Sequence, residues 1–144
     1  MKRFLIRSLF VSLFLAIIGI QFVEIDRTNP PVKEDLNAPS EVKNILRYAC
    51  YDCHSSETKW PWYSKVAPIS WFIVDDVEEG RSHLNFSEWE SLDMAKRREL
   101  KNKIIDEIKD DDMPLKSYTY LHPGASLNLS QKSILNKWLR SVDY

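Results

Sequence analysis

The chain has 144 residues and a formal net charge of -1, and its hydrophobic and charged fractions are those of ordinary globular proteins. This length suits one domain with a short appendage. All 21 acidic residues lie at or after Glu24. The region beyond the N-terminus is therefore mildly acidic, which argues against a nucleic-acid partner. With only three glycines, the chain has no glycine-rich phosphate-binding pattern.

The first 23 residues combine a basic start with an apolar stretch. Met1 to Arg7 is basic, and Leu9 to Ile20 is apolar except for Ser12. This order is typical of an export signal, and Phe4 to Val23 is long enough to span a bilayer. No convincing small-x-small cleavage site follows. We therefore expect residues 1–23 to form an uncleaved single-pass membrane anchor, with the rest of the chain facing outward. A cleaved signal is the alternative.

Residues 24–39 are predicted to be a linker between this anchor and a domain formed by residues 40–144. The stretch from Asp26 to Pro39 holds three of the seven prolines and shows no helical periodicity. It would hold the domain slightly away from the membrane.

Two helices are predicted in the first half of the domain. Ser40 resembles an N-cap, and apolar residues then recur at helical spacing up to Cys50. A second helix is predicted to begin near Pro68, because proline is tolerated in a first helical turn. It is expected to end around Gly80.

Two more helices are predicted in the second half. Ser87 and Glu90 match a Ser-x-x-Glu capping box, so we expect a long charged helix to begin there and to end in the acidic run of residues 110–112. The last helix is predicted to begin near Ser130. Because no alternating strand pattern appears, the sequence predicts an all-α domain.

The motif with the clearest chemistry is C-x-x-C-H at Cys50, Cys53 and His54. This is the attachment signature of c-type haem. Two thiols separated by two residues can reach the two porphyrin vinyl groups and form thioethers, and the next residue then lies under the ring. We therefore predict one covalent haem c per chain, with His54 as an iron ligand.

Other uses of these residues fit less well. Cys50 and Cys53 are the only cysteines, and a bridge between them would close almost no loop, so a disulfide framework is excluded. A zinc site needs four ligands, and adding His83 and His122 matches no common finger spacing. A thioredoxin-like dithiol is expected in a βαβ setting, which this sequence does not predict.

A second axial ligand is predicted at Met113. It precedes Pro114, which biases the methionine backbone away from helix, and its neighbours make a poor apolar core. Filling a core gap is the ordinary alternative for a methionine. His83, His122 and Met94 are the other candidates, and an open iron position is also considered. Methionine ligation would raise the reduction potential relative to two histidines.

The aromatic cluster Trp60-Pro61-Trp62-Tyr63 follows the motif closely. Core packing and a wall of the haem pocket are both open interpretations, and in the second Trp60 and Trp62 would bind the cofactor. Further possible partners of a haem propionate are Arg81, Lys59, Lys65 and Tyr118.

Three stretches carry a resemblance to a known family. They are CYDCHSSETKWPWYSKVAPISWF, GRSHLNFSEW and MPLKSYTYLHPGASLN, and the similarity extends from Ser40 to Leu139. The chain resembles a family of small bacterial haem-binding domain proteins, and its order of elements resembles class I cytochrome c. This resemblance implies a periplasmic, monohaem, cytochrome-c-like domain in which Cys50, Cys53 and His54 carry over directly and Met113 through its Met-Pro element.

The expected function is electron transfer rather than catalysis. A membrane-tethered carrier would pass single electrons between a donor and an unidentified redox partner protein at the outer face of the bacterial inner membrane. Secretion to the periplasm after signal cleavage is the alternative location. A haem-based sensor or a peroxidase-like module would instead require an open sixth coordination position.

Overall fold

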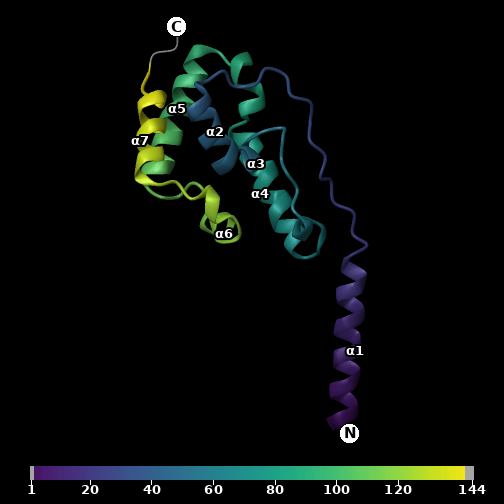
Figure 1. The fold of residues 1–144 in the computed structure, drawn as a ribbon. Coiled ribbons are helices and arrows are strands. Elements are labelled where there is room, and N and C mark those ends of the chain that lie inside the picture. Colours follow the sequence, from purple (N-terminus) through teal and green to yellow (C-terminus); the bar gives the residue numbers. More distant parts are fainter. Residues whose placement is uncertain (1, 142–144) are drawn as a thin grey trace.

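A computed structural model describes residues 2–141, and these residues form helices and loops without a strand (Figure 1). The α-helices are α1 Lys2–Ile20, α2 Ser40–Ala49, α3 Tyr51–His54, α4 Ile69–His83, α5 Met94–Lys109, α6 Lys116–Leu121 and α7 Leu129–Leu139. The 3₁₀ helices are η1 Trp62–Lys65, η2 Phe86–Ser91 and η3 Pro123–Ala125. The all-helical prediction is confirmed for the described residues.

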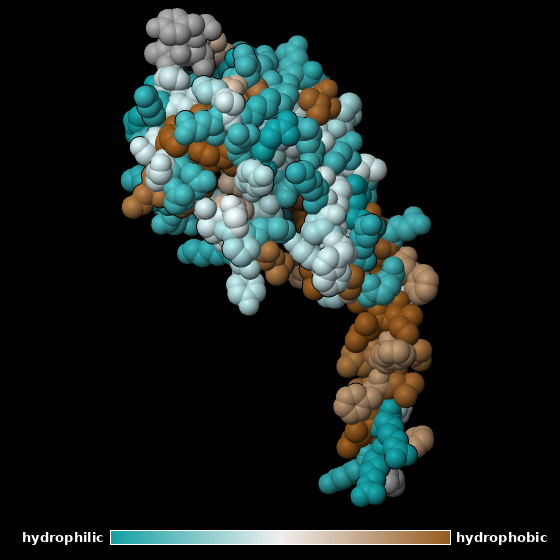
Figure 2. Space-filling model, viewed as in Figure 1, coloured by the Kyte–Doolittle hydropathy of each residue, from teal (hydrophilic) through white to brown (hydrophobic). Residues whose placement is uncertain are grey.

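Helix α1 stands apart from the other helices, which gather into one body (Figure 1). None of its residues is buried, and Figure 2 shows its surface as mostly hydrophobic above a hydrophilic N-terminal end. Its length and composition are enough to cross a membrane. The chain therefore begins with an apolar helix that is a signal sequence or a single membrane span.

The segment predicted as a linker packs against the domain over its second half. Leu36 is 1% exposed and belongs to the hydrophobic core. Its amide donates to the Phe86 carbonyl at 2.9 Å, and the amides of Lys33 and Glu34 both lie 3.1 Å from the Ser87 carbonyl. These hydrogen bonds hold residues 33–36 alongside η2, just before α2 begins.

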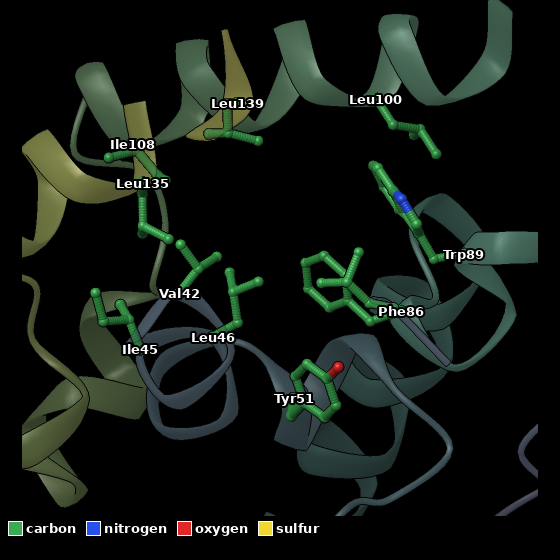
Figure 3. Close-up of a cluster of buried hydrophobic side chains, with 11 residues drawn as sticks. Val42, Ile45, Leu46, Tyr51, Phe86, Trp89, Leu100, Ile108, Leu135 and Leu139 are labelled. Atoms are coloured by element: carbon green, nitrogen blue, oxygen red, sulfur yellow. The ribbon is translucent and has the colours of Figure 1, made fainter. Parts of the chain in front are cut away.

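The hydrophobic core lies where α2, η2, α5 and α7 meet. Figure 3 shows side chains from these elements pointing toward one another. The buried cluster comprises Leu36, Val42, Ile45, Leu46, Tyr51, Phe86, Trp89, Leu100, Ile108, Leu135 and Leu139. The α2 residues among them recur at helical spacing, and burying that stripe is the main stabilisation of so short a helix.

Two predicted helix starts are corrected. Helix α2 does begin at Ser40, but Pro39 occupies the N-cap position and no side chain caps the helix. Ser87 and Glu90 do not open the charged helix, because they lie within η2. Helix α5 begins at Met94 instead, where the Asp93 carboxylate accepts a hydrogen bond from the Lys96 amide at 2.7 Å.

The remaining helices agree more closely with expectation. Helix α5 ends at Lys109, at the edge of the acidic run, as predicted. Helix α7 begins one residue before Ser130. Helix α4 continues past Gly80 to His83. The short helices α3 and α6 were not predicted.

Candidate functional site

The C-x-x-C-H motif forms one tight helical turn after α2. Cys50 ends α2, with its amide donating to the Leu46 carbonyl at 2.8 Å, and its own carbonyl accepts from the His54 amide at 2.8 Å. Helix α3 therefore starts from the end of α2 with a change of direction at Cys50. The hydrophobic packing of α2 fixes where this turn lies.

The turn separates its residues onto two sides. Residues three and four apart lie on the same side of a helix, so Cys50, Cys53 and His54 share a face. Tyr51 points the other way, into the core, where its ring stacks on Phe86 at a centroid distance of 5.3 Å. Its hydroxyl donates to Asp35 at 3.0 Å. The two thiols and the imidazole thus lie on a different side of the turn from the Tyr51 ring, and Cys50 also packs against the edge of the hydrophobic core.

Helix α4 packs against this turn at Gly80. A Cβ atom at Gly80 would lie 2.8 Å from the Cys53 carbonyl oxygen and 3.2 Å from the Cys53 Cβ. Only glycine therefore permits this approach of backbone to backbone. The close contact brings the last turn of α4 beside His54.

The His54 ring is held by backbone carbonyl groups of α4 and its end. Its Nδ1 lies 2.9 Å from the Gly80 oxygen and 3.2 Å from the Leu84 oxygen. Because a carbonyl only accepts, Nδ1 carries the proton, and Nε2 is the nitrogen with a free lone pair. Burial lowers the pKa of His54, which favours the neutral ring. A neutral imidazole fixed through one nitrogen is the usual form of a histidine metal ligand.

A cavity of about 550 Å³ lies beside this turn. Cys50, Cys53, His54 and Met113 all contribute to its wall. Most other lining side chains are apolar, among them Ala49, Leu84, Phe86, Leu100, Ile104, Ile108, Leu115 and Leu127. The volume is within the range of cofactor sites, and apolar walls with a few convergent polar groups are typical of them. The residues present therefore fit a haem attached at the two cysteines.

The structure distinguishes the candidates for a second axial ligand. Met113 lines the cavity from the segment between α5 and α6. His83 also lines it, although 74% of its side chain is exposed and it lies 3.8 Å from Glu79. Met94 is exposed at the start of α5, and the cavity wall does not include it.

Both ring nitrogens of His122 are engaged within the protein. Nδ1 donates to the Tyr118 carbonyl at 3.2 Å, and Nε2 lies 3.0 Å from the Tyr63 hydroxyl, which donates to it. The cavity wall does not include His122. Met113 is therefore the candidate that lies at the cavity without a competing side-chain ion pair or exposed ring.

The two tryptophans predicted to bind the cofactor do not line the cavity. The Trp62 side chain is 77% exposed in η1. Trp60 is partly buried, and its indole N–H has no hydrogen-bond partner among residues 2–141. The structure thus brings Cys50, Cys53, His54 and Met113 together, and leaves Trp60 and Trp62 outside that group.

Tyr118 lines the cavity and is tied to the motif. Its hydroxyl donates to the Asp52 carboxylate at 2.8 Å, which joins α6 to the turn that carries the cysteines. Burial, together with that carboxylate, raises the pKa of Tyr118. The hydroxyl therefore stays protonated at physiological pH and remains a donor.

Sequence reasoning missed the groups that orient His54. They are the backbone carbonyls of Gly80 and Leu84, which no side-chain pattern reveals. The one available signal was a glycine within an otherwise helical pattern, which often marks a close backbone approach. In the sequence alone the same glycine equally predicts the end of a helix.

The two thiols are in an environment that keeps them protonated. Burial is the main cause that raises the pKa of Cys50 to about 12 and that of Cys53 to about 11; at Cys53 the Asp52 and Asp76 carboxylates act in the same direction and Arg81 opposes them. Redox-active cysteines typically have a lowered thiol pKa instead. Within residues 2–141, no group of three or more His, Cys, Asp or Glu side chains is arranged to hold a metal ion.

Comparison with known proteins adds one result. A family model described as "Haem-binding domain" matches residues 15–141. No curated protein and no solved structure matches the chain. The matched range includes the motif, the cavity wall and the hydrophobic core.

Proposed function

Because the chain belongs to the haem-binding domain family, we propose that it is a monohaem c-type cytochrome domain that carries single electrons at the outer face of the bacterial inner membrane. The observation that carries this proposal is the shared cavity wall of Cys50, Cys53, His54 and Met113. Those four side chains come from two separate stretches of sequence, and together they are the set needed to attach a haem and close both of its faces.

Attachment would use the two thiols on the cavity side of the turn. Each sulfur would form a bond to a porphyrin vinyl carbon, and the thiol hydrogen would pass to the other carbon of that vinyl group. Each thiol thereby becomes a thioether with no change in the overall electron count. Cys50 and Cys53 are half-buried and border the cavity, so both are within reach of one ring placed in it.

The axial ligands would be His54 and Met113. The Gly80 and Leu84 carbonyls hold the His54 ring through Nδ1, so Nε2 is left for the iron. Met113 would supply a thioether sulfur from the segment after α5. A histidine–methionine pair favours ferrous iron and fills both axial positions.

When bound, the haem would supply a reversible one-electron couple, taking an electron from a reduced donor and giving it to an oxidised acceptor. The protein's own residues would hold the ligands and keep water away. The apolar side chains of α5 and of the loop before η2 line the cavity for this second role. No group in this scheme makes or breaks a substrate bond, so we propose a carrier and not an enzyme.

The same proposal places the domain through helix α1. An uncleaved α1 would anchor the chain, with Lys2, Arg3 and Arg7 on the cytoplasmic side. The domain would then lie in the periplasm, where covalent haem attachment takes place. A cleaved signal would lead to the same compartment without the anchor.

The experiment is to express the full chain with the haem-maturation machinery and compare oxidised and reduced absorption spectra. We expect the wild type to retain haem under denaturing conditions and to be six-coordinate and low-spin. Met113→Ala should lose the methionine-ligated signal and become high-spin. Met94→Ala is the matched control, because that methionine is exposed and outside the cavity.

Two results would contradict specific parts of the proposal. Absence of covalent haem would reject the main claim, and a Met113→Ala spectrum identical to that of the wild type would reject the sixth ligand. A wild type that is already five-coordinate would favour the sensor or peroxidase-like alternative, with His83 the second histidine on the cavity wall besides His54.

A further inference from the structure

A group of exposed apolar side chains lies between the haem-binding motif and the middle of α4. We name it the aromatic patch, and it comprises Trp62, Val66, Ile69, Trp71 and Phe72. Trp62 is 77% exposed and Phe72 is 68% exposed. Single exposed apolar residues are normal on protein surfaces, but here five lie within eleven positions, on η1, on the start of α4, which packs against η1, and on the segment between them.

The aromatic patch is fixed to the end of α1. The Gln21 side chain, one residue beyond α1, donates to the Ala67 carbonyl at 3.0 Å and accepts from the Ala67 amide at 3.0 Å. Ala67 lies within the patch segment. In Figure 1 the lower end of α4 and the adjoining η1 lie beside the upper end of α1.

The length of α1 places the contact between Gln21 and Ala67 at a membrane surface. Nineteen residues of α-helix extend about 28 Å, close to the hydrocarbon thickness of roughly 30 Å in a bilayer. If α1 spans, Gln21 lies at the boundary between hydrocarbon and headgroups. The hydrogen bonds from Gln21 then hold Ala67, and the patch around it, at the same depth.

The charge distribution along α4 agrees with that placement. The first turn of α4 carries Ile69 and Phe72, whereas the next turns expose Asp75, Asp76, Glu78 and Glu79. Lys65 is exposed in η1, beside the patch. Tryptophan is enriched at membrane interfaces and basic side chains reach lipid phosphates, while carboxylates avoid an anionic surface. Figure 2 shows hydrophobic surface continuing from α1 to the adjacent edge of the domain.

From these observations we infer that the aromatic patch docks the domain onto the headgroup region of the bilayer that α1 spans. The inference rests on the proposed function in one respect, the retention of α1 as a membrane anchor. It adds an orientation, because a domain docked through residues 62–72 cannot turn freely on its linker.

This orientation has a consequence for the haem cavity. Gly80, where α4 meets the motif, is eleven residues beyond Ile69, or about 16 Å along the helix. The acidic residues of α4 that border the cavity, Asp76 and Glu79, lie in that distal part. Docking through the first turn leaves the exposed carboxylates of Asp76 and Glu79, on the border of the cavity, further along α4 than the docked rings and accessible to a protein partner.

The test measures hydrogen–deuterium exchange of the full chain in nanodiscs made of phosphatidylethanolamine and phosphatidylglycerol. The comparison is between the wild type and Trp62→Ser/Phe72→Ser. We expect amides of residues 60–73 to exchange at least about tenfold faster in the double variant, because two aromatic rings no longer insert into the interface. The matched control is Met94→Ser/Leu129→Ser, which removes two exposed apolar side chains from α5 and α7 on the far side of the domain. It should leave exchange in residues 60–73 unchanged.

The outcomes separate this inference from the proposed function. Haem absorbance of the same samples reports on cofactor attachment, while exchange of residues 60–73 reports on docking whether or not haem is bound. Equal exchange in the wild type and the double variant would overturn the docking inference. So would a chain that does not stay with the nanodiscs, or protection that appears only when several chains share a disc, which would indicate contact between copies.

Discussion

Gly80 is the residue at which α4 touches the haem-binding turn, and its lack of a side chain makes the contact possible. Its Cβ position is 2.8 Å from a backbone oxygen, which cannot move aside as the end of a flexible side chain would. The same residue also supplies a carbonyl to His54. Packing and ligand orientation therefore depend on one backbone position.

We expect Gly80→Ala to destabilise the domain by about 1–3 kcal/mol, since overpacking forces the backbone of α4 or of the motif to shift. The measurement is urea denaturation of the full chain followed by circular dichroism. Gly124→Ala is the matched control, because a Cβ there meets nothing within 4 Å. If the two variants were equally stable, the contact between Gly80 and Cys53 would not be as close as described.

The sequence predicts some residues of the site and not others, depending on whether the residue type itself carries the information. The cysteines and His54 were predictable because side-chain identity and spacing are themselves the signal. The role of Gly80 was not, because a glycine at a tight contact and a glycine at a helix end look alike in one sequence. The contact depends on where α4 packs, and that is settled by the rest of the fold.

At the scale of elements, two residues of N-cap type differ in whether they cap a helix. Asn128 and Gln131 form a reciprocal capping box at α7, with both hydrogen bonds at 2.9 Å. Ser40 has the residue type of an N-cap but makes no capping bond, because α2 begins one position earlier than a Ser40 cap would require.

We therefore expect Asn128→Ala to lower stability by about 1 kcal/mol and Ser40→Ala to have little effect. Thermal unfolding of both variants, followed at 222 nm, provides the comparison, and the lost bonds at the start of α7 are the physical reason for the difference. A Ser40→Ala variant as unstable as Asn128→Ala would show that Ser40 caps α2 in solution.

The elements that were predicted are those with a long buried stripe. Helices α2, α5 and α7 each carry apolar residues at helical spacing, so periodicity predicted that they exist even where the predicted caps were wrong. Helices α3 and α6 have four and six residues, too few to establish a period. The residues expected to start the charged helix form η2 instead, where the Asn85 side chain accepts from the Ser87 amide and the rings of Phe86 and Trp89 are buried. Tertiary burial outweighed a capping pattern there.

At the scale of the whole molecule, the candidate site is assembled from segments far apart in the chain. Sequence could rank Met113 above the histidines, but only the fold shows that Met113 and His54 share a cavity while His122 is engaged by Tyr63 and Tyr118. The same holds for Trp60 and Trp62. Their nearness to the motif in sequence does not bring them to the cavity wall, because the chain turns away after His54 through residues 55–61.

Arg81 connects three parts of the molecule. Toward the chain after the haem-binding turn, its Nε donates to the Ser55 carbonyl at 2.8 Å and its Nη2 to the Thr58 hydroxyl at 2.8 Å. Toward the linker, Nη2 also donates to the Asn29 side chain at 2.6 Å, and Nη1 donates to the Thr28 carbonyl at 3.3 Å. It thereby fastens the first half of the predicted linker to the chain just after the haem-binding turn, from a position on α4.

Replacing Arg81 by lysine keeps the charge but removes the planar set of donors, and one ammonium cannot reach all four acceptors. We expect Arg81→Lys to lose about 1.5–3 kcal/mol of the stabilisation that holds residues 28 and 29 in place. Trypsin cleavage after Arg27 should then be about tenfold faster or more, because the protease needs a locally released backbone. Densitometry of the full chain in nanodiscs over time measures this rate. Arg140→Lys is the control, since among residues 2–141 the Arg140 side chain bonds only to the Asn136 side chain in the preceding helical turn. An Arg81→Lys variant cleaved at the wild-type rate would mean that Arg81 does not hold residues 28 and 29 in place.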